Sequence, residues 1–368
     1  MRYCKRCVMP DTKPGVTFNA EGVCSACQAV ERKAGVDWEA RANALRTLCD
    51  SIRGSNGNGY ECVVPVSGGK DSTYQTYMMS QVYKLKTLCV IVVPHLQTRE
   101  GILNLNTLVS HHGVDLLKIS VRPSTLKKIR RIALTEIGNP NYAEHRVVFA
   151  AVALAAMLNN VPLVVWGEDI AAELGGNVAD SAQDGSAEDL INNDLFRERG
   201  FDELLAGRIP ENELIFYRHP DKEELRRKKI RSIYLGHYHS WDPYENFQTA
   251  QKYGFTARSA PLPGNLWTFD NIDEKLCEIH LWFKFLKLGF WSPTDQCCSD
   301  IWAGRMTRQE AVELVNAKQY EFPSAYFWEF LEYHQLSEEE FWTVADHFRN
   351  QDIWHLVGNE WRLKNELV

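Results

Sequence analysis

The stretch Val66-Ser-Gly-Gly-Lys-Asp-Ser72 stands between a short apolar run, Cys62-Val-Val-Pro-Val66, and a segment of helical character that continues to about Tyr83. A strand, a glycine turn and a helix in this order can bind an anion. Glycines let the backbone approach the ligand closely, and the free amides at the helix start favour negative charge. Lys70 adds a positive charge, and the two serines add hydroxyl donors. The stretch therefore predicts a phosphate-binding loop.

The spacing of this loop differs from that of a Walker loop, which needs four residues between its first glycine and Gly-Lys-Ser/Thr. Every fixed position instead matches SGGxDS, so the stretch resembles the PP-loop of ATP pyrophosphatases. The resemblance implies ATP as substrate and pyrophosphate as product, with Lys70 and Asp71 as catalytic residues and Asp71 beside Mg²⁺. The residues assigned to ATP in the loop are Ser67, Gly68, Gly69, Lys70, Asp71 and Ser72.

Further apolar runs follow the loop, at 87–93, 115–119 and 162–166, and 233–235 is a candidate for another strand of the sheet. Such runs alternating with helices predict a Rossmann-like, doubly wound parallel α/β sheet of the PP-loop type. Ligands of these sheets bind at the carboxyl ends of the strands. The loops after the first and fourth strands should therefore meet, which adds Gly167 and Glu168 to the predicted nucleotide site.

The chain divides into four predicted regions, and the last is mainly helical. The clearest helices there are 270–288 and 307–317, the second beginning with the capping box Thr307-Arg-Gln-Glu310. The regions are a Cys₄ zinc ribbon at 1–36, a helix and linker at 37–59, an ATP-binding α/β domain at 60–245 with an insertion at about 170–230, and a substrate or partner region at 246–368.

Four cysteines near the start form two knuckles, Cys4-Lys-Arg-Cys7 and Cys24-Ser-Ala-Cys27. The pattern CxxC-x16-CxxC is that of a tetrahedral, structural zinc site, and it predicts Zn²⁺ bound by Cys4, Cys7, Cys24 and Cys27. A redox role for one CxxC pair would leave the other pair unexplained. The adjacent Cys297-Cys298 are poorly placed to chelate together, and we interpret them as incidental.

The composition narrows the class of protein. A formal charge of −7 argues against a broad nucleic-acid-binding face. No signal peptide is evident, and the most apolar stretch, 147–158, is too short to span a bilayer. Ten cysteines without such a signal favour reduced thiols and metal ligation, so we expect a cytoplasmic protein without membrane insertion.

Several segments, taken in order, resemble one family, the N-acetyl sugar amidotransferases of bacterial surface-polysaccharide synthesis. Two departures, Trp291 where the family pattern has glycine and Trp302 where it has arginine, leave the identity of the sugar open. The segments are Cys4-Lys-Arg-Cys-Val-Met-Pro10, the loop 66–72, Trp166-Gly-Glu168, Glu173-Leu-Gly-Gly176, Leu235-Gly-His-Tyr238, Trp241-Asp242, Pro261-Leu-Pro263, the helix 280–289 and Arg305-Met-Thr-Arg-Gln-Glu-Ala311.

The family resemblance implies a reaction in which ATP adenylates the acetamido oxygen of a sugar nucleotide and ammonia then displaces AMP. A separate class I glutaminase, with a cyclase-like companion subunit, would supply the ammonia. Residues assigned to the sugar nucleotide are Glu173, Gly175, Gly176, Arg258 and Arg305.

Two other functions remain open on the sequence. One is a PP-loop tRNA-modifying enzyme of the thiolation or lysidine type, which the acidic charge balance disfavours. The other is a nucleotide-sensing adaptor with a zinc ribbon, which would release no pyrophosphate.

Overall fold

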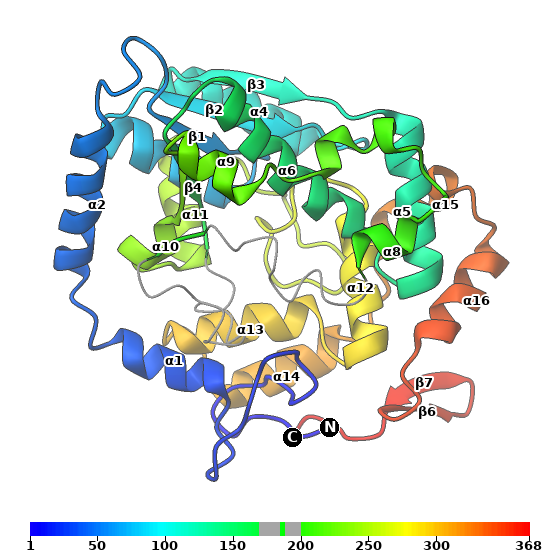
Figure 1. The fold of residues 1–368 in the computed structure, drawn as a ribbon. Coiled ribbons are helices and arrows are strands. Elements are labelled where there is room, and N and C mark those ends of the chain that lie inside the picture. The colour runs from blue at the N-terminus through cyan, green and yellow to red at the C-terminus, as the bar shows by residue number, and fades with distance from the viewer. Residues whose placement is uncertain (169–184, 188–199) are drawn as a thin grey trace.

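The computed structural model of the chain describes residues 1–168, 185–187 and 200–368. At its centre lies a five-stranded sheet in the order β3-β2-β1-β4-β5, with every neighbouring pair parallel (Figure 1). The chain enters at the central strand, moves outward to one edge, and then crosses to the other side. The strands are β1 (Cys62–Pro65), β2 (Thr87–Val92), β3 (Asp115–Ile119), β4 (Leu163–Trp166) and β5 (Arg231–Tyr234).

The predicted doubly wound parallel fold is confirmed, and the reversal of strand order lies between β1 and β4. Ligands of such sheets bind at this switch point, beyond the carboxyl ends of the strands. The first four predicted strands agree with the structure to within a residue, and β5 begins two residues before the predicted 233–235. The reason is burial on both faces, which makes the inner strands read as continuous apolar runs.

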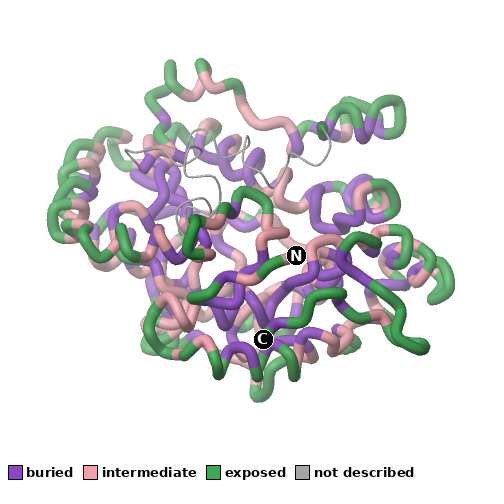
Figure 2. Tube along the Cα trace, turned by 90° about the horizontal axis from the view of Figure 1, so that it is seen from below, coloured by how far each residue is buried: buried purple, intermediate pink, exposed green. Residues whose placement is uncertain are grey.

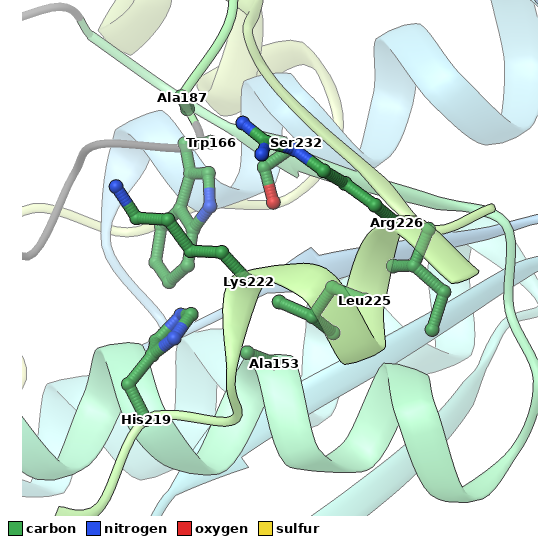
Figure 3. A pocket seen from close by; sticks show the side chains of 9 residues that line it. Ala153, Trp166, Ala187, His219, Lys222, Leu225, Arg226 and Ser232 are labelled. Carbon is green, nitrogen blue, oxygen red and sulfur yellow. The ribbon is translucent and has the colours of Figure 1, made fainter. Parts of the chain in front are cut away.

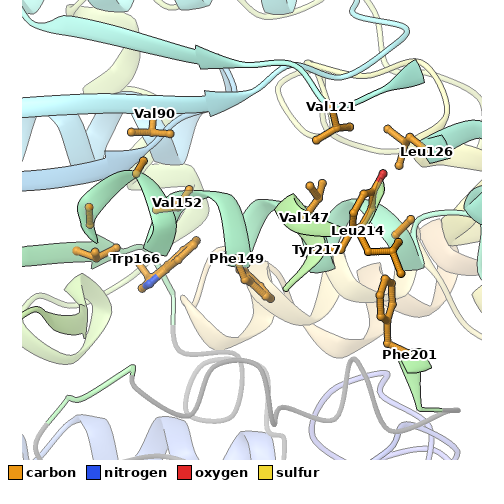
Figure 4. Packing of buried hydrophobic residues seen from close by; sticks show 14 of the residues in the cluster. Val90, Val121, Leu126, Val147, Phe149, Val152, Trp166, Phe201, Leu214 and Tyr217 are labelled. Atoms are coloured by element: carbon orange, nitrogen blue, oxygen red, sulfur yellow. The ribbon is translucent and has the colours of Figure 1, made fainter. Parts of the chain in front are cut away.

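Helix α6 (Tyr142–Leu158) covers one face of the sheet. Figure 4 shows Val147, Phe149 and Val152 of this helix beside Val90 of β2 and Trp166 of β4. Its many alanines allow a close approach to the strands. Alternate strand residues point to the opposite face, where a second cluster packs them against the helices 38–52, 70–77 and 99–112.

The other elements of the α/β part surround this sheet, and α5 (Pro123–Ile137) connects β3 with α6. They are α1 (Ser25–Lys33), α2 (Trp38–Ile52), α3 (Lys70–Tyr77), the π-helix η1 (Met78–Val82), α4 (Arg99–His112), α8 (Phe201–Leu205), the 3-10 turns η5 (Glu211–Glu213) and η6 (Ile215–Tyr217), α9 (Lys222–Arg227), α10 (Leu235–Tyr238) and α11 (Pro243–Lys252).

The C-terminal region is mainly helical, as predicted, and ends in a β-hairpin that the sequence did not predict. Aromatic side chains of several of its helices form one core, which also takes in Leu134 of α5. The elements are α12 (Cys277–Leu288), α13 (Ser292–Trp302), α14 (Arg308–Lys318), the 3-10 turn η7 (Ser324–Tyr326), α15 (Phe327–His334), α16 (Glu338–Phe348), β6 (Trp354–Val357) and β7 (Glu360–Leu363).

One predicted helix is wrong in its first part. The sequence predicts a helix over 270–288, whereas α12 begins only at Cys277. Asn271 has a φ of 45°, in the left-handed region, so a right-handed helix cannot pass through it. The residues before α12 instead form a loop over the phosphate-binding turn.

The ribbon at the N-terminus packs on the C-terminal helices rather than on the sheet. Its cysteines share one buried cluster with residues of α13 and α14, and these segments lie side by side in Figure 1. Figure 2 shows, in a second view, buried segments gathered in the interior, while exposed residues alternate with buried ones along the peripheral helices and occupy many loops. Among the described residues, no helix is both long and apolar enough to cross a membrane.

Candidate active site

The phosphate loop joins the end of β1 to the start of α3. Gly68 has a φ of 93°, and a Cβ at this position would lie 2.4 Å from the carbonyl oxygen of Gly101. Only glycine fits there, for both conformational and steric reasons. Two serines brace the turn. Ser67 Oγ accepts from the Gly69 amide at 3.2 Å, and Ser72 Oγ donates to the Gly69 carbonyl at 3.0 Å.

Lys70 lies buried between two carboxylates. Its Nζ donates to Asp71 at 2.9 Å and to Asp270 at 2.8 Å, and it lies 5.6 Å from the ring centre of Phe269. Burial disfavours the charged lysine, but Asp270 and Asp71 outweigh burial and raise the pKa of Lys70. The second oxygen of Asp71 accepts from Asn246 of α11 at 2.9 Å, which fixes the carboxylate. Lys70 is therefore a permanent, oriented cation beside the phosphate loop.

The loop before α12 is held against the phosphate loop by contacts from both directions. Arg258 donates to the carbonyls of Asp270 at 2.7 Å and of Asn271 at 2.6 Å. Thr98, the N-cap of α4, donates its amide to the carbonyl of Asp273 at 3.1 Å. These backbone contacts replace the helical hydrogen bonds that the sequence pattern predicts.

A cavity of about 370 Å³ opens at the phosphate loop, a volume in the range of small-molecule sites. One wall is apolar and comes from β2 and α6, which suits a flat base. The other wall is polar and comes from the start of α6 and the loop before α12. The apolar lining includes Val90, Val92, Val147, Val148 and Val152, and the polar lining includes Ser67, Asp71, Ser72, Asn141, Glu144, His145, Asn271, Asp273 and Glu274.

Behind the polar wall, Arg130 of α5 is fully buried and paired with two carboxylates. It contacts Glu144 at 2.7 Å and Glu274 at 2.8 Å, and it donates to Asn141 at 2.6 Å. Burial opposes its charge, and the two carboxylates outweigh burial and raise the pKa of Arg130. Burial also raises the pKa of Glu144. Lys70 and Arg130, which lie beside the cavity without lining it, are thus both engaged by carboxylates of the protein.

Asp273 is the cavity carboxylate without such a cation. Among the described residues, no lysine, arginine or histidine forms an ion pair with it. The pKa of Asp273 is raised to about 6, mainly by burial and also by the neighbouring Glu274, against the opposing effects of Ser67 and of the charge of Arg258. Asp273 therefore titrates near neutrality next to the phosphate loop.

The predicted second nucleotide loop is only partly described. A Cβ on Gly167 would lie 2.5 Å from Nε2 of Gln75, and its carbonyl accepts from the Gly236 amide at 2.9 Å, so close packing explains this glycine. Glu168 is half-buried at the end of the described segment. Contacts of Gly167 and Glu168 with a nucleotide stay predictions, and the predicted substrate residues Glu173, Gly175 and Gly176 lie outside the described residues.

The two arginines assigned to the substrate are both engaged within the protein. Arg258 positions the loop before α12, as described above. Arg305 pairs with Asp242 at 2.7 Å and Asp300 at 2.8 Å, and it lies over the ring of Tyr244. Their contact with a substrate stays a prediction, and the geometry gives each a role in joining segments.

The four ribbon cysteines converge on one point. The Sγ atoms of Cys4 and Cys27 lie 3.9 Å apart, those of Cys7 and Cys24 lie 3.7 Å apart, and all four lie within 4.8 Å of one another. All four side chains are buried. The arrangement brings together the complete ligand set that the sequence predicts.

Residues of α13 and α14 complete the surroundings of the ribbon. The Trp302 indole donates to Cys27 Sγ at 3.3 Å, and Arg308 Nε lies 3.2 Å from the carbonyl oxygens of both Cys4 and Cys7. Cys298, interpreted above as incidental, is fully buried and belongs to the same hydrophobic cluster as the four ribbon cysteines. It is a fifth cysteine against the cluster, which spacing in the sequence could not indicate.

A second, smaller pocket lies between α6, β4, β5 and α9. Figure 3 shows Lys222 and Arg226 of α9 directed toward Trp166 and Ser232, with His219 at the lower edge. Burial lowers the pKa of His219, so its ring is neutral at physiological pH. None of the described residues that line the pocket is acidic.

The sequence reasoning missed Asp270, Asp273 and the group around Arg130. A signal for the first two existed in the polar run Asp270-Asn-Ile-Asp-Glu274, whose charges are unusual in the first turn of an apolar helix. Arg130 and Glu144 carry no such signal, because their pairing depends on the packing of α5 and α6.

The parallel sheet, the glycine turn after its central strand and the cavity at that turn define the class of protein. The chain has a doubly wound parallel α/β fold with a candidate phosphate-binding site at the switch point of its sheet.

Residues 232–367 match the family model described as "LPS biosynthesis protein WbpG-like, C-terminal domain". This match covers less than half of the chain, and it confirms the resemblance to a surface-polysaccharide family over that part. An uncharacterized protein of Methanocaldococcus jannaschii, MJ1599, is 27% identical over 115 residues, 31% of this chain and 41% of the relative. The chain thus spans less than half the length of this curated relative.

Solved structures similar to the chain come from several organisms. NMN synthetase from Francisella tularensis has a TM-score of 0.31 and 17% identity, over 53% of this chain and 93% of that chain. An NH3-dependent NAD synthetase from Campylobacter jejuni has a TM-score of 0.30 and 17% identity, over 61% and 100%. The U34-tRNA thiolase NcsA from Methanococcus maripaludis, with its 4Fe-4S cluster, has a TM-score of 0.28 and 12% identity, over 83% and 86%.

Proposed function

We propose that the chain is an ATP-dependent amidotransferase that converts the acetamido group of a sugar nucleotide into an acetamidino group. The observation that carries the proposal is the shared construction of the cavity. A PP-loop forms one side of it, and a loop from the WbpG-like part, with Asp273 in the cavity wall and Asp270 bound to Lys70, forms the other. An ATP-activating element thus faces a domain described for LPS biosynthesis.

The chemistry needs activation because an acetamido carbonyl is a poor electrophile. Its oxygen attacks the α-phosphate of ATP, the bond to pyrophosphate breaks, and the amide nitrogen loses its proton to give an O-adenylyl imidate. Ammonia then adds to the imidate carbon, one of its protons moves to the imidate nitrogen, and the carbon–oxygen bond breaks with its electrons leaving on AMP. The products are the acetamidinium group, AMP and pyrophosphate.

The residues of the chain act mainly by positioning and by charge. The loop amides and Lys70 hold the β- and γ-phosphates, and the apolar wall of β2 and α6 holds the base. Asp71, fixed by Asn246, is oriented to hold Mg²⁺, which would neutralise phosphate charge.

The basic side chains of α9, Lys222 and Arg226, are our candidate contacts for the phosphates of the sugar nucleotide. The pocket beneath α9 is small, with a volume of about 20 Å³, so the phosphates would bind at its mouth rather than inside it.

An isotope experiment tests adenylation directly. Substrate with ¹⁸O in the acetyl carbonyl, incubated with ATP, Mg²⁺ and an ammonium salt, should yield acetamidino product together with ¹⁸O-labelled AMP. Unlabelled AMP beside authentic amidine would refute adenylation at that oxygen. Formation of ADP and phosphate would exclude the PP-loop reaction altogether.

We also propose that the ribbon binds zinc rather than an iron–sulfur cluster. Zn–S bonds of about 2.3 Å in a tetrahedron place sulfurs about 3.8 Å apart, and two sulfur pairs here lie at 3.7 and 3.9 Å. A cluster places several iron atoms between the thiolates and spreads them farther apart. Such a closed site is structural.

Ammonia would come from a separate class I glutaminase with a cyclase-like companion subunit, in the cytoplasm. The purified chain should then use ammonium salts at high pH but not glutamine, and adding the glutaminase should make glutamine usable. Glutamine-supported turnover by the isolated chain would refute the need for a partner.

A further inference from the structure

The amination step needs a proton acceptor, because ammonia is largely protonated at neutral pH and ammonium has no lone pair for attack. The acceptor must lie in the cavity beside the phosphate loop, where the adenylated group forms, and it must be anionic before the transfer. Lys70 and Arg130 cannot serve, since both are permanent cations.

Three of the other carboxylates facing the cavity already contact a cation of the protein. Asp71 accepts from Lys70 and Asn246, and Glu144 and Glu274 both pair with Arg130. Carboxylates that already contact a fixed cation are less available to bind an ammonium ion. These three carboxylates therefore serve to hold the cations in place.

His145 also faces the cavity, and burial lowers its pKa, so its ring is neutral. A neutral ring attracts ammonium less than a carboxylate does. The ring also stands on α6, near His280 at a ring-centre distance of 6.2 Å, rather than on the phosphate loop.

We propose that Asp273 is the catalytic residue that binds the incoming ammonium ion and accepts a proton from it. Its carboxylate lines the same cavity as Ser67 of the phosphate loop, and it forms no ion pair among the described residues. Thr98 fixes its backbone at 3.1 Å, and a Cβ on Gly101 would lie 2.6 Å from its Cα, so the position is rigid. The inference rests on the proposed amidotransferase function.

In this step ammonium and the Asp273 carboxylate become ammonia and the carboxylic acid. The nitrogen lone pair then forms the bond to the imidate carbon, and AMP leaves with the electrons of the carbon–oxygen bond. The Asp273 proton returns to solvent after product release. A pKa of about 6 suits this role, because the group is mostly ionised at pH 7 yet still basic enough to take a proton.

The test compares the wild type with Asp273→Asn, using ammonium chloride or hydroxylamine as the nucleophile. Hydroxylamine is a weaker base than ammonia and is largely unprotonated at pH 7.5, so it needs no proton acceptor. We expect kcat/KM for ammonium to fall about 100-fold or more, while the rate with hydroxylamine changes little. Asp352→Asn, an exposed aspartate in the turn before β6, is the matched control and should behave as wild type.

A second measurement tests adenylation alone, through substrate-dependent exchange of labelled pyrophosphate into ATP without any nucleophile. Asp273→Asn should retain this exchange, which also shows that the variant is folded. Loss of exchange would overturn the proposal by assigning Asp273 to the ATP site. An unchanged kcat/KM for ammonium, or an ammonium-specific defect in His145→Gln instead, would overturn it as well. If the wild type itself forms no amidine, the proposed function fails, and the two failures are distinguishable.

Discussion

The cavity at the phosphate loop and the pocket beneath α9 share helix α6 but differ in charge. The cavity wall carries Asp71, Glu144, Asp273 and Glu274, and its cations are already engaged by carboxylates. The pocket carries Lys222 and Arg226, and no acidic side chain lies among its described lining residues. Arg226 also pairs with Glu223 at 2.7 Å, so the two regions differ in the sign of their lining charge rather than in having free cations. This difference in sign is the reason why we assign Mg²⁺-bound ATP to the cavity and the phosphates of the second substrate to the basic side chains of α9.

The largest expected effect comes from substitution of Lys70 beside the cavity. In Lys70→Ala, the phosphate loop loses its cation and leaves Asp71 and Asp270 facing each other, so pyrophosphate release should fall at least about 1000-fold. Removing one partner of a buried ion pair should also lower the free energy of unfolding by about 3 kcal/mol. Activity is measured at saturating ATP and folding by circular dichroism, with Lys252→Ala on the exposed end of α11 as control. A folded Lys70→Ala variant with full turnover would contradict the role of this lysine.

Loss of the metal from the ribbon should change neither the cavity nor the pocket directly, because the ribbon packs against α13 and α14. A Cys4→Ser/Cys24→Ser variant should lose one Zn²⁺ per chain and about 3 kcal/mol or more of folding free energy, with turnover of the folded fraction changed less than about threefold. Elemental analysis and thermal unfolding measure both effects. Cys49→Ser, a buried cysteine of α2, should keep the metal. Equal zinc in both variants would rule the site out.

Substitutions in the basic pocket test whether its side chains bind the sugar nucleotide rather than ATP. Losing two charge-assisted contacts in Lys222→Gln/Arg226→Gln should raise KM for the sugar nucleotide about 10- to 100-fold and leave KM for ATP unchanged. The matched control is Arg227→Gln/Lys228→Gln, on the exposed side of the same helix. A rise in KM for ATP instead would place the nucleotide in the pocket and reverse the assignment.

The smallest expected effect is on the free energy of unfolding, through the ionisation of Asp273 in the cavity. The folded-state pKa of Asp273, about 6, lies above its usual value of 3.8, so folding disfavours its charged form. The contribution of this group to stability is therefore fully present below about pH 4 and is lost as the pH rises through 6. Asp273→Asn should exceed the wild type in unfolding free energy by about 1–2 kcal/mol at pH 7.5, and the gain should vanish at pH 4. Thermal unfolding at both pH values measures it, and a gain independent of pH would contradict the charge argument.

The phosphate loop and the strands were predictable from the sequence because their physics is local. Gly68 is required by the positive φ and the close backbone contact of the turn itself. Strands buried on both faces appear in the sequence as continuous apolar runs. The two CxxC knuckles are also local, and their convergence follows from the spacing alone.

The partners of the loop were not predictable, because they depend on distant packing. Asp270 lies 200 positions after Lys70, and the apolar spacing of Ile272, Leu276 and Ile279 continues the helical pattern of α12 through the loop. This apolar spacing indicates which residues are buried, but it does not predict the left-handed backbone conformation of Asn271. The same limit hid Cys298, whose neighbour Cys7 belongs to the opposite end of the chain.

The contact between Arg308 and the ribbon has a consequence for synthesis of the protein. Arg308 and Cys4 are separated by 304 residues, so the ribbon emerges from the ribosome long before the helices that cover it. At about 5–20 residues per second, this delay lasts on the order of 15–60 seconds. During that time four thiols are exposed to solvent, and a metal that arrives early would protect them from oxidation. Metal supply during translation, rather than after it, is then expected to set the yield of folded protein.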